Sequence, residues 1–282
     1  MSPEPLTVAE AVPIGTVHLQ RMLDGVGVRS LAIKGPAFVA LGVRPPRQSN
    51  DIDLLIHEDD RATATEALAG AKWSVISHWF PSALDEIIYS TTFRHALFPV
   101  TLDLHHRFSG LLTGAAAFET LWDRRTQVEV AHQAVVTVGR EHALVLEALN
   151  AMKLLEEGRR AASAARVVSA AEHFDAAEVA EAALSVGARH TAAPLITALG
   201  GGAPVDPPPP GYRRWQARGA RNSTRDLIVD LIRRAPGQIP RVVWQQLTLD
   251  PATARFWAHA HGLAYRSRWQ ILGSRIGRTL RR

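Results

Sequence analysis

The sequence contains no cysteine among its 282 residues and no long apolar run. Without cysteine the chain cannot form disulfides, bind a metal through thiolates or use a cysteine nucleophile. No segment reaches the roughly 18 consecutive apolar residues that a membrane-spanning helix needs. The opening MSPEPLTVAEAVP also lacks the basic stretch and apolar core of a signal peptide. We therefore expect a cytoplasmic protein with no transmembrane segment.

Lysine is scarce, and negative charge is nearly missing from the last quarter of the chain. Three lysines stand against 29 arginines, which is typical of a GC-rich genome. Residues 211–282, the basic C-terminal segment, hold 15 arginines and three aspartates and so carry +12. Since the whole chain carries +5, residues 1–210 carry −7. Codon usage explains the preference for arginine but does not explain why the basic residues gather at one end.

The spacing of apolar residues predicts alternating helices and strands in the first half. Residues 7–24 are spaced as a helix that ends at Gly25, and VRSLAI then predicts a short strand that stops at the turn Lys34-Gly35-Pro36. The further elements predicted are a helix over 36–43, a strand over 51–57, a helix over 58–71, and strands over 73–79 and 100–108, with 81–99 unassigned.

After residue 140 the sequence predicts alanine-rich helices. One helix runs through 141–158, with Gly158 placed to end it. The Asp-x-x-Glu pattern at Asp175 is a capping-box signature for another helix. Residues 200–211 are rich in glycine and proline, so they predict a linker or long loop.

The end of the basic C-terminal segment predicts an amphipathic helix. Trp269, Leu272, Ile276 and Leu280 have helical spacing, and arginines flank them. The pattern fits a terminal helix that packs on the protein with a solvated basic flank. It also fits a platform for RNA or a phosphorylated substrate, or a contact with an anionic membrane surface.

Two aspartates lie two residues apart in the strand DIDLLI. Asp51 and Asp53 therefore share one face of the strand, while Ile52 and Leu54 point into the core. Two carboxylates on one face repel each other unless a cation neutralises them. Mg²⁺ suits such a pair, because it takes one or two carboxylates and completes its shell with water and substrate phosphates. Asp103, in the middle of the strand predicted over 100–108, is a third candidate ligand.

Each of these carboxylates also has a simpler explanation. The pair could cap the turn after RQSN, and Asp103 could form an ion pair with Arg107 or Arg94. His105 and His106 beside Asp103 suggest a zinc site. Their side chains point to opposite faces of a strand, however, so they cannot both bind one ion there.

The segments LAIKGPAFVAL, R-x-S-x-DIDLLI and TLDLHHRF resemble the DNA polymerase β-like nucleotidyltransferase superfamily. More narrowly, they are similar to a family of uncharacterised bacterial nucleotidyltransferases in which a Lys-Gly turn replaces the usual Gly-Ser or Gly-Gly. RQSNDID is also similar to the abortive-infection type nucleotidyltransferase toxins. The resemblance covers roughly residues 10–155. It implies an α+β core over 1–140, with a mixed sheet and flanking helices, followed by a helical domain over 141–282.

The resemblance implies Mg²⁺-dependent transfer, with Mn²⁺ an alternative, of a nucleoside monophosphate from a triphosphate such as ATP. The acceptor would be a hydroxyl or phosphate, and pyrophosphate would leave. Asp51 and Asp53 would hold the metal on the triphosphate, and Asp103 would join the second metal and help to deprotonate the acceptor. The residues implied in nucleotide binding are Lys34, Gly35, Arg47, Ser49 and Lys153.

The turn departs from the usual pattern. Pro36 removes one backbone donor, and the hydroxyl that commonly follows the glycine is missing. A catalytically degenerate fold used as a binding module is therefore one alternative, and a toxin-like transferase acting on RNA is another. Arg44 and Arg47 are expected in a mobile loop, where only Arg47 has support from the motif. The acceptor is unknown, and a polyanion held by the basic C-terminal segment is one candidate.

Overall fold

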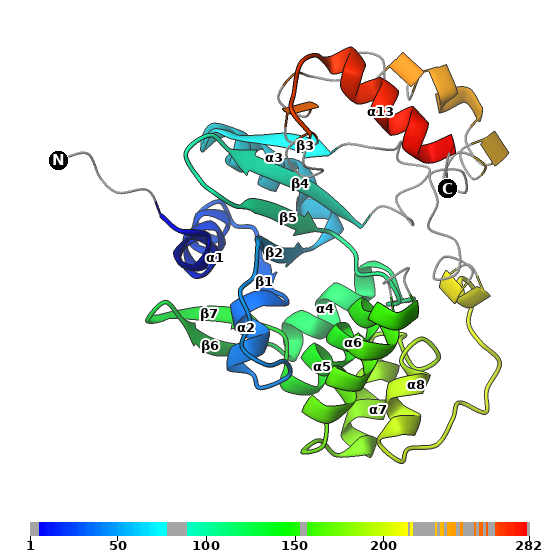
Figure 1. Cartoon of the computed structure of the whole chain (residues 1–282). Helices are drawn as coiled ribbons and strands as arrows, with labels where there is room; N and C mark the ends of the chain where they lie inside the picture. The colour runs from blue at the N-terminus through cyan, green and yellow to red at the C-terminus, as the bar shows by residue number, and fades with distance from the viewer. Residues whose placement is uncertain are drawn as a thin grey trace.

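The structure is a computed structural model that describes residues 6–77, 89–152 and 157–216 apart from 214, a few positions between 229 and 258, and residues 263–280. Its first elements are α1 Val8–Asp24, β1 Ser30–Ala32, α2 Gly35–Ala40, β2 Asp51–Ile56, η1 Glu58–Asp60, α3 Arg61–Gly70, β3 Trp73–Ser77, β4 Ser90–His95 and β5 Thr101–His105. Then follow α4 Ala115–Asp123, β6 Thr126–Val130, β7 Gln133–Thr137, α5 Arg140–Ala151, α6 Glu157–Ala170, α7 Ala176–Ser185, α8 Ala193–Ala198, η3 Pro236–Gln238 and α13 Arg268–Leu280. Figure 1 shows helices α4 to α8 gathered beside the sheet.

The described strands form one seven-stranded mixed sheet. Its order is β3-β4-β5-β2-β1-β7-β6, in which β2 pairs with β5 in parallel, as β1 does with β7. The other neighbours are antiparallel. This sheet with its flanking helices confirms the predicted α+β class.

The central strand β2 is buried on both of its faces. On one face Asp53 is 7% exposed and Leu55 is 2% exposed. Ile52, Leu54 and Ile56 have almost no exposed surface. Helix α1 packs close to this strand at Gly15, where an added Cβ would lie 2.5 Å from Ile52 Cδ1 and 2.8 Å from Phe98. A glycine in the helix thus sets how closely α1 approaches the sheet.

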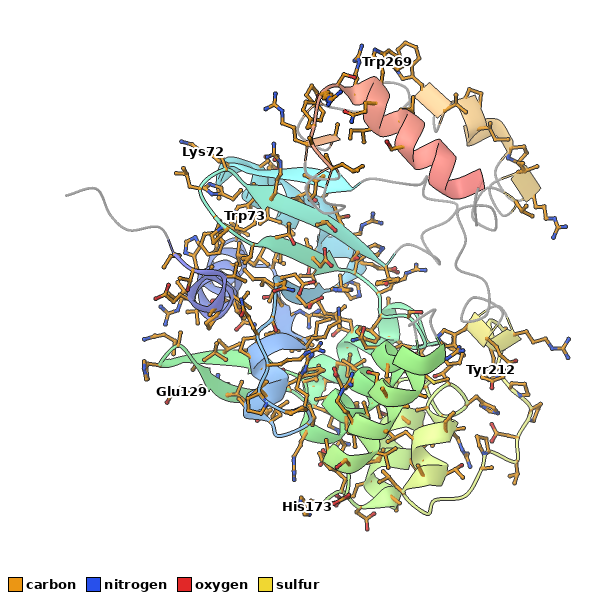
Figure 2. All side chains as sticks on the ribbon, viewed as in Figure 1. Lys72, Trp73, Glu129, His173, Tyr212 and Trp269 are labelled. Carbon is orange, nitrogen blue, oxygen red and sulfur yellow. The ribbon has the colours of Figure 1, made fainter. Side chains whose placement is uncertain are left out.

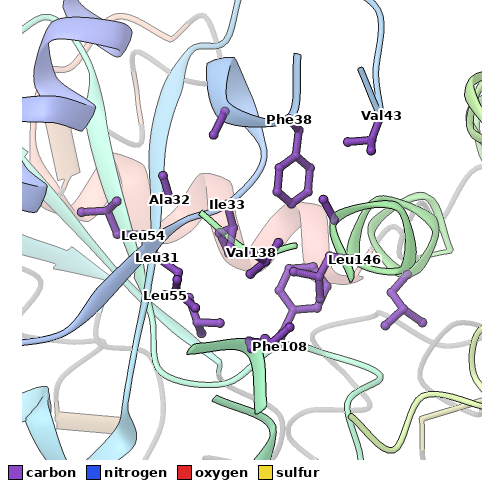
Figure 3. Packing of buried hydrophobic residues seen from close by; sticks show 14 of the residues in the cluster. Leu31, Ala32, Ile33, Phe38, Val43, Leu54, Leu55, Phe108, Val138 and Leu146 are labelled. Atoms are coloured by element: carbon purple, nitrogen blue, oxygen red, sulfur yellow. The ribbon is translucent and has the colours of Figure 1, made fainter. Parts of the chain in front are cut away.

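One apolar cluster joins the sheet to the neighbouring helices. Figure 3 shows the part of it where β1, β2 and α2 face α5, with these labelled side chains: Leu31, Ala32, Ile33, Phe38, Val43, Leu54, Leu55, Phe108, Val138 and Leu146. The loop between α2 and β2 and the start of α5 are therefore held against the same core, which fixes the surroundings of the two aspartates at the start of β2.

A helix is present where one was predicted over 141–158, but the prediction of where it ends is wrong. Helix α5 stops at Ala151, with Met152 as its C-terminal cap, and Gly158 lies inside the first turn of α6. A glycine ends a helix by adopting positive φ, and Gly158 is not among the glycines that do so. The cap at Asp175 is confirmed, since its side chain accepts hydrogen bonds from two backbone N–H groups of α7. Residues 200–211 form neither helix nor strand, as predicted.

The strand predicted over 73–79 is present as β3, and the unassigned segment 81–99 contributes β4. Residues 78–88 lie outside the described residues.

The terminal helix is present as α13, but its predicted apolar face is wrong at Trp269. Trp269 is 56% exposed, whereas Ile271, which is not one of the four residues of the predicted face, is fully buried. Figure 2 shows Trp269 at the outside of the molecule. Among the described helices, none has the length and apolar character needed to cross a membrane.

Candidate active site

The parallel pairing of β2 and β5 places two aspartates side by side. Asp53 lies opposite Asp103, and Asp51 lies opposite Thr101. Asp53, Asp103 and His105 each offer one ligand atom, and these atoms all lie within 4.8 Å of one another. Asp51 is outside this group among the described residues, but its charge still acts on Asp103. The sheet therefore brings together two of the three predicted carboxylates and adds a histidine.

Lys34 reaches this group from the end of β1. Its Nζ lies 2.5 Å from Asp53 Oδ1 and 3.5 Å from His105 Nε2. Burial acts to lower the pKa of Lys34, but the charge of Asp53 and the hydrogen bond to it, together with the charge of Asp103, raise that pKa. The Lys34 backbone has φ 61° and ψ −154°, a conformation that is otherwise almost limited to glycine and costs about 1–3 kcal/mol. The chain therefore holds a strained lysine at the place where a glycine would fit more easily.

His105 holds the other side of Asp53. Its Nε2 lies 2.8 Å from Asp53 Oδ1, and its ring stacks on Tyr89 at 5.6 Å between centroids. Only 1% of His105 is exposed. The sequence places this residue on the same face as Asp103, two residues away, but does not reveal its contact with the neighbouring strand. His106 is also buried but is not in the metal-capable group.

The two paired aspartates have opposite pKa shifts. Burial raises the pKa of Asp53, but the charge of Lys34 and the hydrogen bond from His105 outweigh burial and lower it to about 2. Burial and the negative charge of Asp53 raise the pKa of Asp103 to about 6. Its hydrogen bond from Thr92 Oγ1, at 2.6 Å, offsets only part of that rise. The same two causes raise the pKa of Asp51. The site therefore has too little positive charge for its carboxylates.

The simpler explanation for Asp103 is wrong. Arg107 pairs with Glu58, with an N–O distance of 2.7 Å, and within the described part of the chain neither Arg107 nor Arg94 pairs with Asp103. The nearest polar partner of Asp103 is the neutral hydroxyl of Thr92. Its carboxylate thus stays without an ion pair of its own, which is what a ligand for an incoming cation requires.

The glycine turn and the R-x-S motif meet. Gly35 has φ 46°, and a Cβ added to it would lie 3.4 Å from Ser49 Oγ. A larger residue would therefore be strained and would press on Ser49. Arg47 is exposed in the same loop. Lys153, the remaining predicted nucleotide-binding residue, lies outside the described residues.

Arg44 was expected in a mobile loop, and that expectation is wrong because the residue is only 6% exposed. Its Nε lies 3.7 Å from Glu147 Oε1 of α5. Burial lowers the pKa of Arg44, although Glu147, Asp53 and Asp51 all act to raise it. Its Nη2 is buried without a hydrogen-bond partner among the described residues. The sequence gives no signal for this contact, which joins positions about a hundred residues apart.

A mixed sheet that aligns two aspartates beside a glycine turn is the arrangement expected of a nucleotidyltransferase. The chain belongs to the family of uncharacterised nucleotidyltransferases, whose family model matches residues 15–226. It is thus a transferase of this class, and the predicted family is confirmed. No curated protein matches the sequence.

Three solved structures show what the chain is similar to. The lincosamide antibiotic adenylyltransferase LnuA, with lincomycin bound, is 15% identical over 55% of this chain and 94% of its own, with a TM-score of 0.37. The antibiotic-resistance factor ANT(2'')-Ia is 15% identical over 66% and 96%, with a TM-score of 0.42. An antigenic nucleotidyltransferase-like protein from Paracoccidioides brasiliensis is 18% identical over 69% and 95%, with a TM-score of 0.39.

Proposed function

We propose that this nucleotidyltransferase moves a nucleoside monophosphate from a nucleoside triphosphate to an acceptor hydroxyl or phosphate, with the help of a divalent metal ion. The observation that carries the proposal is the register of Asp53 opposite Asp103 on adjacent parallel strands. This register places the buried carboxylate of Asp53 beside the half-buried carboxylate of Asp103, without enough positive charge to neutralise both. A divalent cation would supply the missing charge.

The residues present fit such an ion. Carboxylate oxygens of Asp53 and Asp103 suit Mg²⁺, and the nearby His105 Nε2 makes Mn²⁺ equally suitable. Asp51, next to Asp53 on the same strand face, would be a further ligand. When bound, the metal would orient the triphosphate and offset the charge that develops during transfer.

The chain's own residues would perform the remaining tasks. Asp103, with its pKa raised to about 6, is ionised at neutral pH and is still basic enough to accept a proton from an acceptor hydroxyl. Lys34 and Ser49 lie beside the Gly35 turn and would bind phosphate oxygens. Arg47 is exposed in the same loop, close enough in sequence to join them. A role for Lys153 stays a prediction from the resemblance.

The acceptor and the division of labour along the chain also stay proposals. We propose that residues 1–140 carry the chemistry and that residues 141–282 help to select the acceptor. The charge of +12 on the basic C-terminal segment favours an anionic acceptor. The comparisons do not support RNA as that acceptor, so the toxin-like function stays a prediction.

Thermal melting with each of the four nucleoside triphosphates, with and without Mg²⁺ or Mn²⁺, tests the binding step. A bound nucleotide at a hundredfold excess over its Kd should stabilise the protein by about 2.7 kcal/mol, and only when metal is present. Asp53→Asn should lose this shift, while the matched control Asp59→Asn, whose side chain is 86% exposed, should keep it. A protein that no triphosphate stabilises would not have the proposed function.

Transfer itself is tested with α-labelled triphosphate and three acceptor groups: small neutral hydroxyl compounds, phosphorylated small molecules and RNA. Label on any acceptor, lost in Asp53→Asn but kept in Asp59→Asn, supports the transferase. Metal-dependent nucleotide binding with no transfer to any group favours the degenerate binding module, for which the Lys34-Gly35-Pro36 turn is the specific evidence.

A further inference from the structure

Lys34 has a backbone conformation that does not suit a lysine. Four non-glycine residues in the described part of the chain have positive φ: Lys34, Lys72, Ala131 and His132. Lys34 combines φ 61° with ψ −154°, and among these four residues it is the one whose side chain pairs with Asp53. Glycine would adopt this conformation without strain. The side chain must therefore provide something that glycine cannot.

The ammonium of Lys34 lies where a metal ion would bind. Its Nζ contacts Asp53 Oδ1, the same oxygen that His105 Nε2 approaches to 2.8 Å. Asp53 and His105 are two of the three groups that could ligate a metal. A divalent ion and an ammonium cannot share this position, because both need the same carboxylate oxygen and they repel each other.

The ammonium also has a path away from Asp53. Its side chain is 15% exposed, whereas that of Asp53 is only 5% exposed, so Lys34 is the partner that can move. The lysine side chain is a flexible four-carbon stem with a compact charge. Its root is the residue just before the Gly35 turn, beside Ser49. A small rotation of the stem would therefore bring the ammonium toward a phosphate held at that turn.

We propose that Lys34 is an exchangeable counter-cation. It occupies Asp53 until metal and nucleotide bind, and then leaves Asp53 to the metal and binds a phosphate oxygen of the nucleotide. This inference rests on the proposed function and adds an order of events to it. The lysine keeps the buried carboxylate neutralised between turnovers, and the nucleotide gives the displaced ammonium a new partner. Metal without nucleotide must displace the lysine with no such compensation.

The first experiment measures the affinity for Mn²⁺ alone, by electron paramagnetic resonance of the free ion at about pH 8. Removing the competing ammonium in Lys34→Met should raise Mn²⁺ affinity on the order of tenfold. The matched control is Lys72→Met, because Lys72 has positive φ as well but is exposed. Figure 2 shows Lys72 on the outside of the molecule. This control should leave the affinity unchanged.

Lys34→Gly separates the charge from the backbone strain. It removes the ammonium and relieves the strained conformation, so it should bind Mn²⁺ as tightly as Lys34→Met while being the more stable of the two. Should Lys34→Met fail to fold, Lys34→Gly therefore gives the same measurement. At saturating Mg²⁺ both variants should lose nucleotide affinity, by about tenfold, because a charge-assisted contact to phosphate is gone.

The second experiment observes the displacement directly. The chain has only three lysines, so their side-chain NMR signals can be resolved and assigned with the Lys34→Arg and Lys72→Met proteins. Saturating Mg²⁺ and nucleotide should shift the Lys34 Cε and Nζ signals strongly and leave those of Lys72 in place. If only the electric field at Lys34 changed, its signals would shift slightly. The ammonium protons would still exchange slowly with water, because the ion pair with Asp53 would remain.

The outcomes distinguish this inference from the proposed function. Tighter Mn²⁺ binding in both Lys34 variants, together with a shifted Lys34 signal, supports the exchange. A Lys34→Met or Lys34→Gly protein that binds Mn²⁺ no better than wild type overturns it, as does a Lys34 signal that stays in place when melting shows the nucleotide site to be saturated. The proposed function survives both of these results. It fails if wild type binds no nucleotide with metal, or if wild type transfers label to none of the three acceptor groups.

Discussion

The substitutions Asp53→Asn and Asp103→Asn should change the stability of the protein in opposite directions. The two side chains are partners in one register and have the same chemistry, yet their environments differ. The pKa of Asp103 is raised from its ordinary 3.8 to about 6, mainly by burial and then by the charge of Asp53. The pKa of Asp53 is lowered to about 2, because the effects of Lys34 and His105 together outweigh that of burial.

For Asp103, the folded protein binds the proton more tightly than the unfolded chain does. Its contribution to stability is therefore greatest below pH 3.8 and is lost as pH rises through about 6. A shift of roughly two pKa units corresponds to about 3 kcal/mol. In metal-free buffer above the folded pKa, Asp103→Asn should thus stabilise the protein by up to about 3 kcal/mol. The asparagine can still accept the hydrogen bond from Thr92.

For Asp53 the direction is reversed. Its contribution is present above pH 3.8 and is lost as pH falls toward about 2. Asp53→Asn should therefore destabilise the protein at neutral pH by about 2 kcal/mol, from the size of the pKa shift. The variant also leaves the ammonium of Lys34 without its ion-pair partner, which adds to the loss.

Urea unfolding followed by circular dichroism, at about pH 4, 6 and 8, measures both variants against wild type. The gain from Asp103→Asn should grow with pH over this range, and the loss from Asp53→Asn should persist throughout it. Asp59→Asn is the exposed control. An Asp103→Asn protein that is less stable than wild type at about pH 8 would refute the idea that Asp103 lacks a counter-charge. Both paired variants should lose metal-dependent transfer.

Two further predictions concern packing. Arg44→Met should cost about 3–5 kcal/mol, because it leaves Glu147 buried without a charged partner, and Arg44→Met with Glu147→Leu should recover most of that loss. Unfolding of the single and double variants measures both effects, and a double variant as unstable as the single one would contradict this. Gly15→Ala should cost about 1–3 kcal/mol through the clash with Ile52. Gly70→Ala, on the exposed end of α3 with nothing within 4 Å, should be neutral or stabilising in the same melts.

Local patterns were enough to predict most elements of the fold. The apolar run after Asp51 and the alternation around Asp103 each identify a strand, because side chains on a strand alternate between its two faces. The sequence does not contain the register between the two strands. Parallel strands are joined by long connections, so no short turn fixes how they align. That register is what places Asp53 opposite Asp103.

Predictions failed where contacts distant in sequence decide the outcome. Arg44 lies in a loop with two prolines after it, which suggests exposure, yet α5 buries it through Glu147. A glycine such as Gly158 is typical of a helix end, but Gly158 does not have positive φ and lies in the first turn of α6. The turn at Lys34 was visible, but the sequence does not reveal that its positive φ directs the ammonium to Asp53.

The sheet order explains why only one of the two paired aspartates is neutralised. Strand β2 has β1 as its other neighbour, and Lys34 follows the end of β1 by two residues, so its ammonium reaches Asp53. Strand β5 has β4 as its other neighbour, and β4 offers only the neutral hydroxyl of Thr92 to Asp103. The asymmetry of charge is thus a consequence of topology. It leaves one carboxylate already paired and the other more basic, which is the arrangement that the proposed metal binding and proton acceptance need.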